Sequence, residues 1–120
     1  MIEIVALLLL SQQPLQPFTE GVASYYTVAS SSTLTASGEP MRDAALTCAM
    51  VDGEFGTYYL VVAEDTGRSV VCRLNDRGPY VKGRVIDLSR AAMRELAGPD
   101  GLADVKVYRL GHAPPPSLTQ

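Results

Sequence analysis

One short stretch of the chain gathers the side chains best suited to chemistry. Residues 75–89 read N-D-R-G-P-Y-V-K-G-R-V-I-D-L-S and follow an apolar, β-branched run at residues 69–74 that predicts a buried strand. Asp76 therefore stands where a strand gives way to a turn. The Gly-Pro step after it holds this turn, because glycine admits positive φ and proline fixes its own φ. Such a rigid bend is a suitable platform for a reactive carboxylate, and the structural alternative is that Asp76 only caps the turn and pairs with Arg77.

The elements that must position this turn are mostly short strands. Residues 57–63 and 68–74 are rich in β-branched and aromatic residues on either side of E-D-T-G, and they predict a hairpin. Residues 89–97 predict a helix whose N-cap is Ser89, and the polar–apolar alternation of residues 104–110 predicts a closing strand. Many short strands with one helix indicate a small barrel rather than a sandwich.

The amino-terminal half of the domain is less regular. Residues 21–28 contain strand-forming residues, and a small polar loop at residues 29–37 leads to the turn G-E-P, which presents Glu39. Residues 43–50 predict either a short helical turn with Asp43 as its N-cap or an irregular strand. The residue pattern does not decide between these two structures.

Length and composition indicate one domain without a nucleic-acid or metal site. The chain has 120 residues, 47% of them hydrophobic, and a net charge of −3 without a basic block, so it can bury one core and is a poor match for nucleic acid. The sole histidine, His112, and the cysteines Cys48 and Cys72 have no metal-ligand spacing, and no cofactor is expected. The cysteines form either one disulfide or two buried thiols.

The two ends of the chain flank the predicted domain, which spans residues 21–110. The amino end, residues 1–20, carries an apolar run at residues 4–10 and then a proline-containing linker. This run follows Glu3 rather than a basic residue and is far below the roughly 20 residues that span a bilayer. We therefore expect no transmembrane segment but an arm that docks onto this domain or a neighbour, with a signal peptide as the alternative. The proline-rich tail, residues 111–120, is a second segment for docking to protein neighbours.

A series of short motifs runs through the predicted domain in a fixed order. They are G-V-A-S-Y-Y, T-A-S-G-E-P, A-L-T-C-A-M, F-G-T, G-R-S-V-V-C-R-L-N-D-R-G-P-Y and G-R-V-I-D-L-S-R-A-A. This order resembles the rare lipoprotein A type of double-psi β-barrel. The resemblance implies a mainly β fold, a six-stranded double-psi β-barrel with one or two short helices, similar to expansins and family 45 glycoside hydrolases. Characterised members of that family are lytic transglycosylases that cleave peptidoglycan glycan strands, often strands without stem peptides.

Carried over position by position, the resemblance implies a groove built from Glu39, the histidine of a Leu-Thr-Ala-Ala-His motif, and Asp76. Both carboxylates are present, but the motif reads L-T-C-A-M here, and Met50 occupies the histidine position. A methionine neither carries a proton nor donates a hydrogen bond, so any role of that histidine is lost, and His112 is too far along the chain to be assumed a substitute. Asp87 corresponds to the aspartate of the expansin and family 45 His-Phe-Asp motif. It is a second candidate acid, with charge–dipole stabilisation of the next helix as its alternative role.

Aromatic and basic side chains complete the candidate site. Tyr25, Tyr26 and Tyr80 are candidates for lining a sugar-binding groove, and packing at the barrel surface is the alternative for each. Arg77 is a further candidate for contact with the substrate, because it follows the catalytic candidate Asp76 directly.

Lytic transglycosylation requires an acid and a base but no activated water. The leaving oxygen after N-acetylmuramic acid is protonated, and the C6 hydroxyl of the same sugar attacks the anomeric carbon to give a 1,6-anhydro product. Asp76 can act first as acid and then as base if its surroundings favour the protonated form. Glu39 close by would favour that form, whereas Arg77 would favour the anion if its guanidinium faced the carboxylate. Met50 predicts reduced activity, because loss of a proton-transfer partner costs about 10²–10⁴-fold in rate.

Two functions from different classes are consistent with these residues. The first is a peptidoglycan-cleaving enzyme that uses Asp76 with Glu39 and Asp87. The second is a catalytically inactive glycan-binding or structural barrel within a larger assembly such as a phage tail. Both place the protein against peptidoglycan, in the cell envelope or another extracytoplasmic location, or on a virion.

Overall fold

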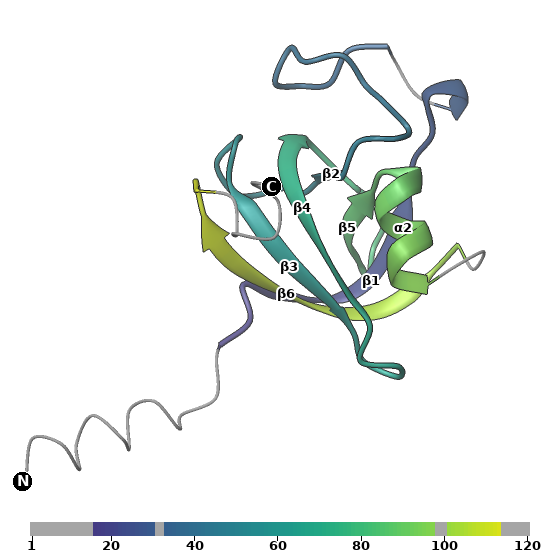
Figure 1. The fold of residues 1–120 in the computed structure, drawn as a ribbon, viewed down its shortest axis with the longest axis vertical. Helices are drawn as coiled ribbons and strands as arrows, with labels where there is room; N and C mark the ends of the chain where they lie inside the picture. The colour runs from purple at the N-terminus through teal and green to yellow at the C-terminus, as the bar shows by residue number, and fades with distance from the viewer. Residues whose placement is uncertain (1–15, 31–32, 98–100, 114–120) are drawn as a thin grey trace, which may run out of the picture.

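A closed barrel of six strands forms the centre of the molecule (Figure 1). The computed structural model describes residues 16–30, 33–97 and 101–113, so the predicted arm at residues 4–10 and the proline run of the tail lie outside the described residues. The elements are β1 (Thr19–Tyr25), the 3₁₀ helix η1 (Val28–Ser30), β2 (Thr47–Ala49), β3 (Tyr58–Ala63), β4 (Ser69–Asp76), β5 (Arg84–Leu88), α2 (Arg90–Ala97) and β6 (Ala103–Gly111). The mainly β class and the barrel expected from the sequence are confirmed.

Two parallel strand pairings set the connectivity of the barrel. β1 pairs parallel with β5 and antiparallel with β6, while β2 pairs parallel with β4 and antiparallel with β5. β3 closes the ring by antiparallel pairing with β4 and β6. Because β2 and β4 run in the same direction, their carboxyl ends meet at one end of the barrel, and the loop of residues 33–46 lies beyond that end (Figure 1).

The predicted β3–β4 hairpin is confirmed. β3 alternates between half-buried and buried residues, and its inward side chains Tyr59, Val61 and Ala63 belong to the core. β5 continues to Leu88, so this strand includes Asp87.

Residues 43–50, for which the sequence left two structures open, contain a short strand rather than a helical turn. β2 spans Thr47–Ala49, and its residues are all buried. The carboxylate of Asp43 accepts a hydrogen bond from the Val28 amide at 2.9 Å, so this side chain holds η1 against the loop instead of capping a helix.

Helix α2 begins and packs as its sequence predicts. The Ser89 hydroxyl oxygen accepts a hydrogen bond from the Ala92 amide at 3.2 Å, which confirms Ser89 as the N-cap. Ala92, Met93 and Leu96 form the buried face of the helix and join the barrel core. The helix thereby covers one side of the barrel beside β4 and β5 (Figure 1).

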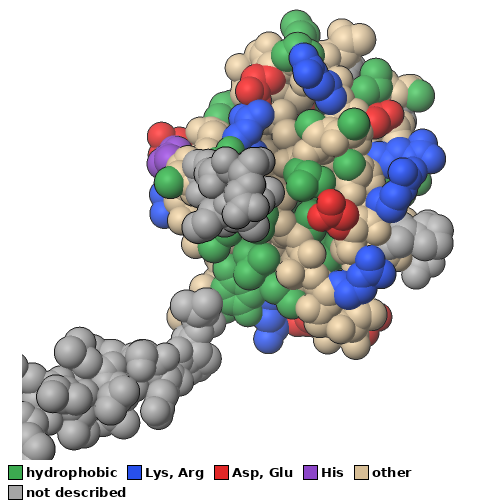
Figure 2. All heavy atoms as spheres, viewed as in Figure 1, with side chains coloured by type: hydrophobic (Ala, Val, Ile, Leu, Met, Phe, Trp, Pro, Cys, Tyr) green, Lys and Arg blue, Asp and Glu red, His purple; other side chains and the backbone are tan. Residues whose placement is uncertain are grey.

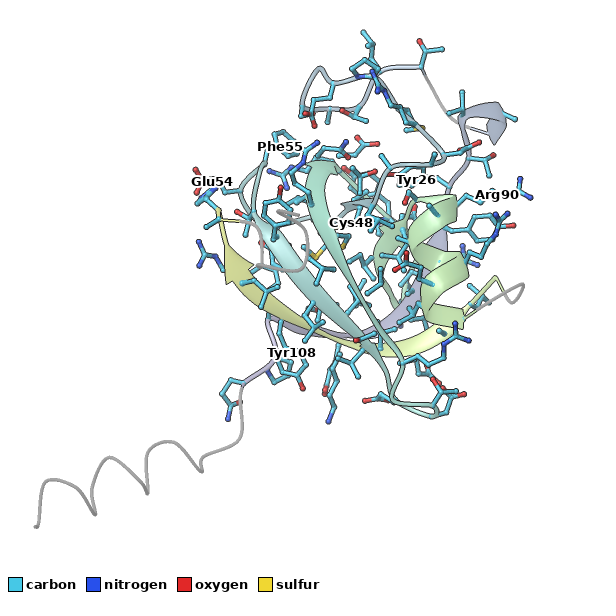
Figure 3. The ribbon with its side chains drawn as sticks, in the orientation of Figure 1. Tyr26, Cys48, Glu54, Phe55, Arg90 and Tyr108 are labelled. Carbon is cyan, nitrogen blue, oxygen red and sulfur yellow. The ribbon has the colours of Figure 1, made fainter. Side chains whose placement is uncertain are left out.

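Both cysteines are buried as free thiols, which resolves the alternative left open by the sequence. Cys48 on β2 and Cys72 on β4 have no exposed surface, and Cys48 lies inside the barrel (Figure 3). Burial, followed by a hydrogen bond with Cys72, raises the pKa of the Cys48 thiol, so this group stays protonated and acts as a small apolar core residue.

The surface carries charges of both signs and one apolar hollow. Figure 2 shows Lys, Arg, Asp and Glu side chains interspersed over one face, with hydrophobic side chains gathered near the start of β1. Phe18 contacts Tyr59 there, with ring centroids 5.2 Å apart, and also lines a hollow of about 390 Å³ with Leu60, Tyr108 and Leu110. Among the described residues, no helix is long and apolar enough to cross a membrane.

Candidate functional site

Asp76 is the last residue of β4, and backbone groups from two other segments hold it. Its Oδ1 atom accepts hydrogen bonds from the Ala36 amide at 2.8 Å and from the Arg77 amide at 2.9 Å. The Met50 amide donates to the Asp76 carbonyl at 3.3 Å. The carboxylate thus caps the turn through a backbone amide, as the structural alternative expects, and it is also tied to the loop of residues 33–41.

The guanidinium of Arg77 turns away from its neighbouring carboxylate. It donates to the Met50 carbonyl at 3.3 Å and to the Gly53 carbonyl at 2.7 Å. Its central carbon lies 4.2 Å from the centre of the Phe55 ring, which stands beside the end of β4 (Figure 3). Within the described part of the chain, Asp76 makes no ion pair, so the pairing with Arg77 that belonged to the structural alternative is absent.

Glu39 is held as an anion by a cation from the barrel. Its Oε1 atom accepts a hydrogen bond from Arg73 Nη1 on β4 at 2.8 Å. This bond lowers the pKa of Glu39, partial burial opposes the shift, and hydrogen bonds from Asn75 and Ser37 reinforce it. Glu39 is therefore a charged acceptor at neutral pH and a poor proton donor.

A polar pocket of about 270 Å³ opens beside this ion pair. Its lining residues are Glu39, Pro40, Arg42, Ala45, Thr47, Arg73 and Asn75. The Ser37 amide donates to the Asn75 carbonyl at 3.1 Å, next to the bond between Ala36 and Asp76. These two hydrogen bonds attach the loop of residues 33–41 to the end of β4. Glu39 and Asp76 therefore lie at the same end of the barrel.

Asp87 lies in the barrel wall, as the next-to-last residue of β5. Its carboxylate accepts a very short hydrogen bond from the Ser24 hydroxyl on β1, and its backbone is in register with Ser24 on one side and Ala49 on the other. The N-cap of the next helix is Ser89 rather than Asp87. Asp87 is consequently anchored between two neighbouring strands.

The three candidate tyrosines have different surroundings. Tyr25 and Tyr80 are 44% and 80% exposed, and both rings are accessible to a ligand. Tyr26 is buried with Met41 and Ala49, and its hydroxyl shares a hydrogen bond of 2.8 Å with Thr47 Oγ1. Burial raises the pKa of Tyr26. The structure therefore packs Tyr26 in a small buried cluster rather than in an open groove, whereas the alternative stated for it was packing at the barrel surface.

No imidazole stands beside Asp76 among the described residues. Met50, at the histidine position of the family motif, is 2% exposed, and its side chain belongs to the barrel core. His112 contacts Glu54 instead, with Nε2 3.2 Å from Oε2. In the part of the chain that the structure describes, no three His, Cys, Asp or Glu side chains gather where they could hold a metal ion.

Sequence reasoning missed the roles of Arg73 and Arg42. Arg73 partners Glu39 although the two residues are far apart in the chain, and Arg42 lines the same pocket from the loop. A usable signal was present for Arg73, because a cation inside an apolar strand needs a partner. The exposed Arg42, in G-E-P-M-R-D, gave no comparable signal.

The strand order and the two parallel pairings define a double-psi β-barrel. A family model described as "Lytic transglycolase" matches residues 19–113, and the chain belongs to this family.

Curated relatives support the same assignment. The chain is 44% identical over 64% of its length to the endolytic peptidoglycan transglycosylase RlpA of Pasteurella multocida, and this match covers 26% of that protein. It is 41% identical over 82% of its length to the protein of the same name from Yersinia pestis, of which 27% is covered. The chain thus spans about a quarter of the length of these relatives.

Solved structures confirm the fold. The Streptomyces papain inhibitor superimposes with a TM-score of 0.61 at 21% identity, covering 81% of this chain and 99% of that one. Expansin from Clavibacter michiganensis superimposes with a TM-score of 0.60 at 22% identity, covering 82% of this chain and 52% of that one. The predicted likeness to the expansin barrel is therefore confirmed.

Proposed function

We propose that this barrel engages peptidoglycan glycan strands and cleaves them by lytic transglycosylation, with Asp76 as the acid and base. The observation that carries the proposal is the setting of Asp76 at the end of β4. Backbone amides fix one carboxylate oxygen, and Arg77 is drawn away to Phe55 and the Gly53 carbonyl. Membership of the lytic transglycolase family supports this reaction.

The proposed reaction moves one proton through one carboxyl group. Asp76 gives its proton to the glycosidic oxygen as the bond to the anomeric carbon breaks. The resulting carboxylate then takes the proton of the C6 hydroxyl, whose oxygen forms the new bond to the anomeric carbon, so the acid is regenerated and no water is consumed. Glu39, an anion at the same end, contributes negative charge where positive charge develops on the sugar.

Met50 makes this a slow version of the reaction. Its thioether cannot move a proton, and its side chain is packed into the core rather than presented to a ligand. Loss of one proton-transfer partner costs about 10²–10⁴-fold in rate. We therefore expect weak turnover, with Asp87 as a second candidate acid and Tyr25, Tyr80 and Arg77 as contacts for the strand.

Met50 also favours a second candidate function. In this alternative, the barrel binds glycan or serves as a structural part of a larger assembly, such as a phage tail, without cleaving the strand. Residues 1–20 and 111–120 would then dock onto protein neighbours. The enzyme would act in the cell envelope or another extracytoplasmic place, and the structural barrel would be carried on a virion.

Incubation with peptidoglycan stripped of stem peptides separates the two functions. Mass spectrometry should detect 1,6-anhydromuropeptides with the wild-type protein and none with Asp76→Asn. Intact glycan pull-down without any anhydro product would rule out the enzyme. Anhydro product that disappears in Asp76→Asn would rule out the purely structural role.

A further inference from the structure

The polar pocket beside Glu39 contains more positive than negative charge. Arg42 and Arg73 contribute two guanidinium groups to its lining, and Glu39 contributes one carboxylate. Arg73 is committed to Glu39 through the 2.8 Å ion pair. Within the described residues, the guanidinium of Arg42 has no ion pair, so the pocket keeps an unneutralised cation at its exposed edge.

The lining of the same pocket includes a buried side-chain oxygen that has no hydrogen-bond donor, in Asn75. Asn75 is 3% exposed, and its Oδ1 atom is buried without a hydrogen-bond partner. Its side chain also hydrogen-bonds Glu39. Native proteins leave few buried acceptors unpaired, so this atom marks the pocket as a place where a polar ligand would complete the hydrogen bonding.

We infer that this pocket is a carboxylate subsite, in which Arg42 binds an acidic group carried by the peptidoglycan strand. This inference rests on the proposed function for the class of ligand. A guanidinium binds a carboxylate through two parallel hydrogen bonds, and the ion pair with Arg73 reduces the repulsion between Glu39 and the incoming anion. Hydroxyl and amide groups next to that carboxylate supply donors for Asn75.

Two parts of peptidoglycan offer a carboxylate to Arg42. One is the lactyl group of muramic acid, which is a free acid only where the stem peptide has been removed. The other is a carboxylate of the stem peptide itself. The pocket of about 270 Å³ has room for either group but not for a whole peptide, so both sources are compatible with the same subsite.

Binding measurements on four soluble probes test the subsite. The probes are stripped glycan strands with free lactyl carboxylates, the same strands converted to methylamides, strands with stem peptides, and neutral chito-oligosaccharide. Each is titrated calorimetrically against the wild type, Arg42→Gln, Arg42→Lys and the matched control Arg109→Gln. Arg109 is an exposed arginine on β6, which does not pair with β2 or β4.

Arg42→Gln should bind the acidic probes about three- to tenfold more weakly, the range for a charge-assisted contact at a partly exposed site. Arg42→Lys should recover part of the loss, and Arg109→Gln should match the wild type. The acidic probe with the larger loss identifies the source of the carboxylate. Chito-oligosaccharide binding should be the same in all four proteins.

Equal binding of free and methylamide strands by the wild type would overturn the inference, and so would unchanged binding by Arg42→Gln. These outcomes are separate from a failure of the proposed reaction. If the wild type yields no anhydro product while Arg42→Gln still loses affinity for acidic strands, the subsite stands and only the catalytic proposal fails.

Discussion

The end of β4 and the wall of the barrel both carry an aspartate, yet they hold it in different ways. Asp76 is the last residue of β4, where it lies opposite Ala49 of β2, and amides from a loop and a turn fix its carboxylate. Asp87 lies between β1 and β2, within the sheet, and is bound by the Ser24 hydroxyl. Both aspartates are half-buried and lie opposite Ala49 of β2, so they differ in what holds them: backbone amides hold Asp76, whereas a side-chain hydroxyl holds Asp87.

The largest expected effect is on the rate of product formation when Asp76 is replaced by a residue that cannot donate a proton. Comparison with Asp87 then shows which aspartate is the acid. Asp76→Asn should lower the rate of anhydro product formation about 10²–10⁴-fold, because an amide cannot act as a general acid. The carbonyl oxygen of the new side chain can still accept the amides of Ala36 and Arg77, so the thermal midpoint should stay near that of the wild type. The control is Asp65→Asn in the exposed β3–β4 turn. Undiminished product from Asp76→Asn would remove Asp76 from the mechanism.

The next largest effect is expected when the histidine of the family motif is restored at position 50. Met50→His should raise the product rate about 10- to 100-fold, part of the usual contribution of a proton-transfer group. The thermal midpoint should fall on the order of 10 °C, because position 50 is 2% exposed and an imidazole there is buried among apolar side chains.

Met50→Leu is the matched control for this change, because it keeps the shape and supplies no imidazole. It should leave both the rate and the thermal midpoint close to the wild-type values. A folded Met50→His protein without any gain in rate would show that the deficit lies elsewhere in the site.

A smaller effect is expected when the wall aspartate is changed. Asp87→Asn should alter the product rate less than tenfold, because the amide oxygen of the new side chain would still accept the Ser24 hydroxyl and the strand pairing is unaffected. Ser24→Ala, which removes only the donor, should give a similar rate. A loss as large as that of Asp76→Asn would place the proton donor in the barrel wall and reverse the comparison.

The smallest effect concerns the pH dependence of stability and tests the ion pair of Glu39. Its pKa is lower in the folded protein than its ordinary value of about 4.3, so its stabilising contribution is complete above that value and is lost as the pH falls through the folded pKa. The urea midpoint of the wild type should therefore exceed that of Glu39→Gln at pH 7 and approach it at pH 3.

The difference should be small, because the Glu39 side chain is 42% exposed and solvent screens the pair. Arg73→Gln is the partner control, and it should reduce the pH dependence in the same way. If the urea midpoints of the wild type and Glu39→Gln differed as much at pH 3 as at pH 7, the proposed role of the ion pair would be contradicted.

Local sequence patterns were sufficient to predict the β3–β4 hairpin and helix α2, but they did not predict the order of the strands in the barrel. The β3–β4 pair and the Ser89 cap depend on neighbouring residues, so periodicity and cap chemistry reveal them. β2 has three residues, which is too few for a period to be read, and the segment before it could equally have been a helical turn. The parallel pairings depend on contacts between distant segments, and only the family resemblance anticipated the barrel they form.

The candidate site shows the same division between local and distant information. The motif places Asp76 at a strand end, and the structure agrees, because the Gly-Pro turn is encoded next to it. The direction of the Arg77 side chain depends on Phe55 and the Gly53 carbonyl, which no pattern around Arg77 specifies. The partnership of Arg73 with Glu39 likewise depends on the strapping of a loop to β4.

The ring order has a consequence for how the molecule is made. During synthesis β1 leaves the ribosome first, but its two partners, β5 and β6, are among the last segments to emerge. Of the early strands, only β3 finds a partner, β4, directly after it. Such a topology folds slowly, because distant segments must lose conformational entropy to meet before strand pairing stabilises them. In a nascent chain that stops short of β6, β1 and β3 each lack one of their two neighbouring strands, and proteases can reach their unpaired edges.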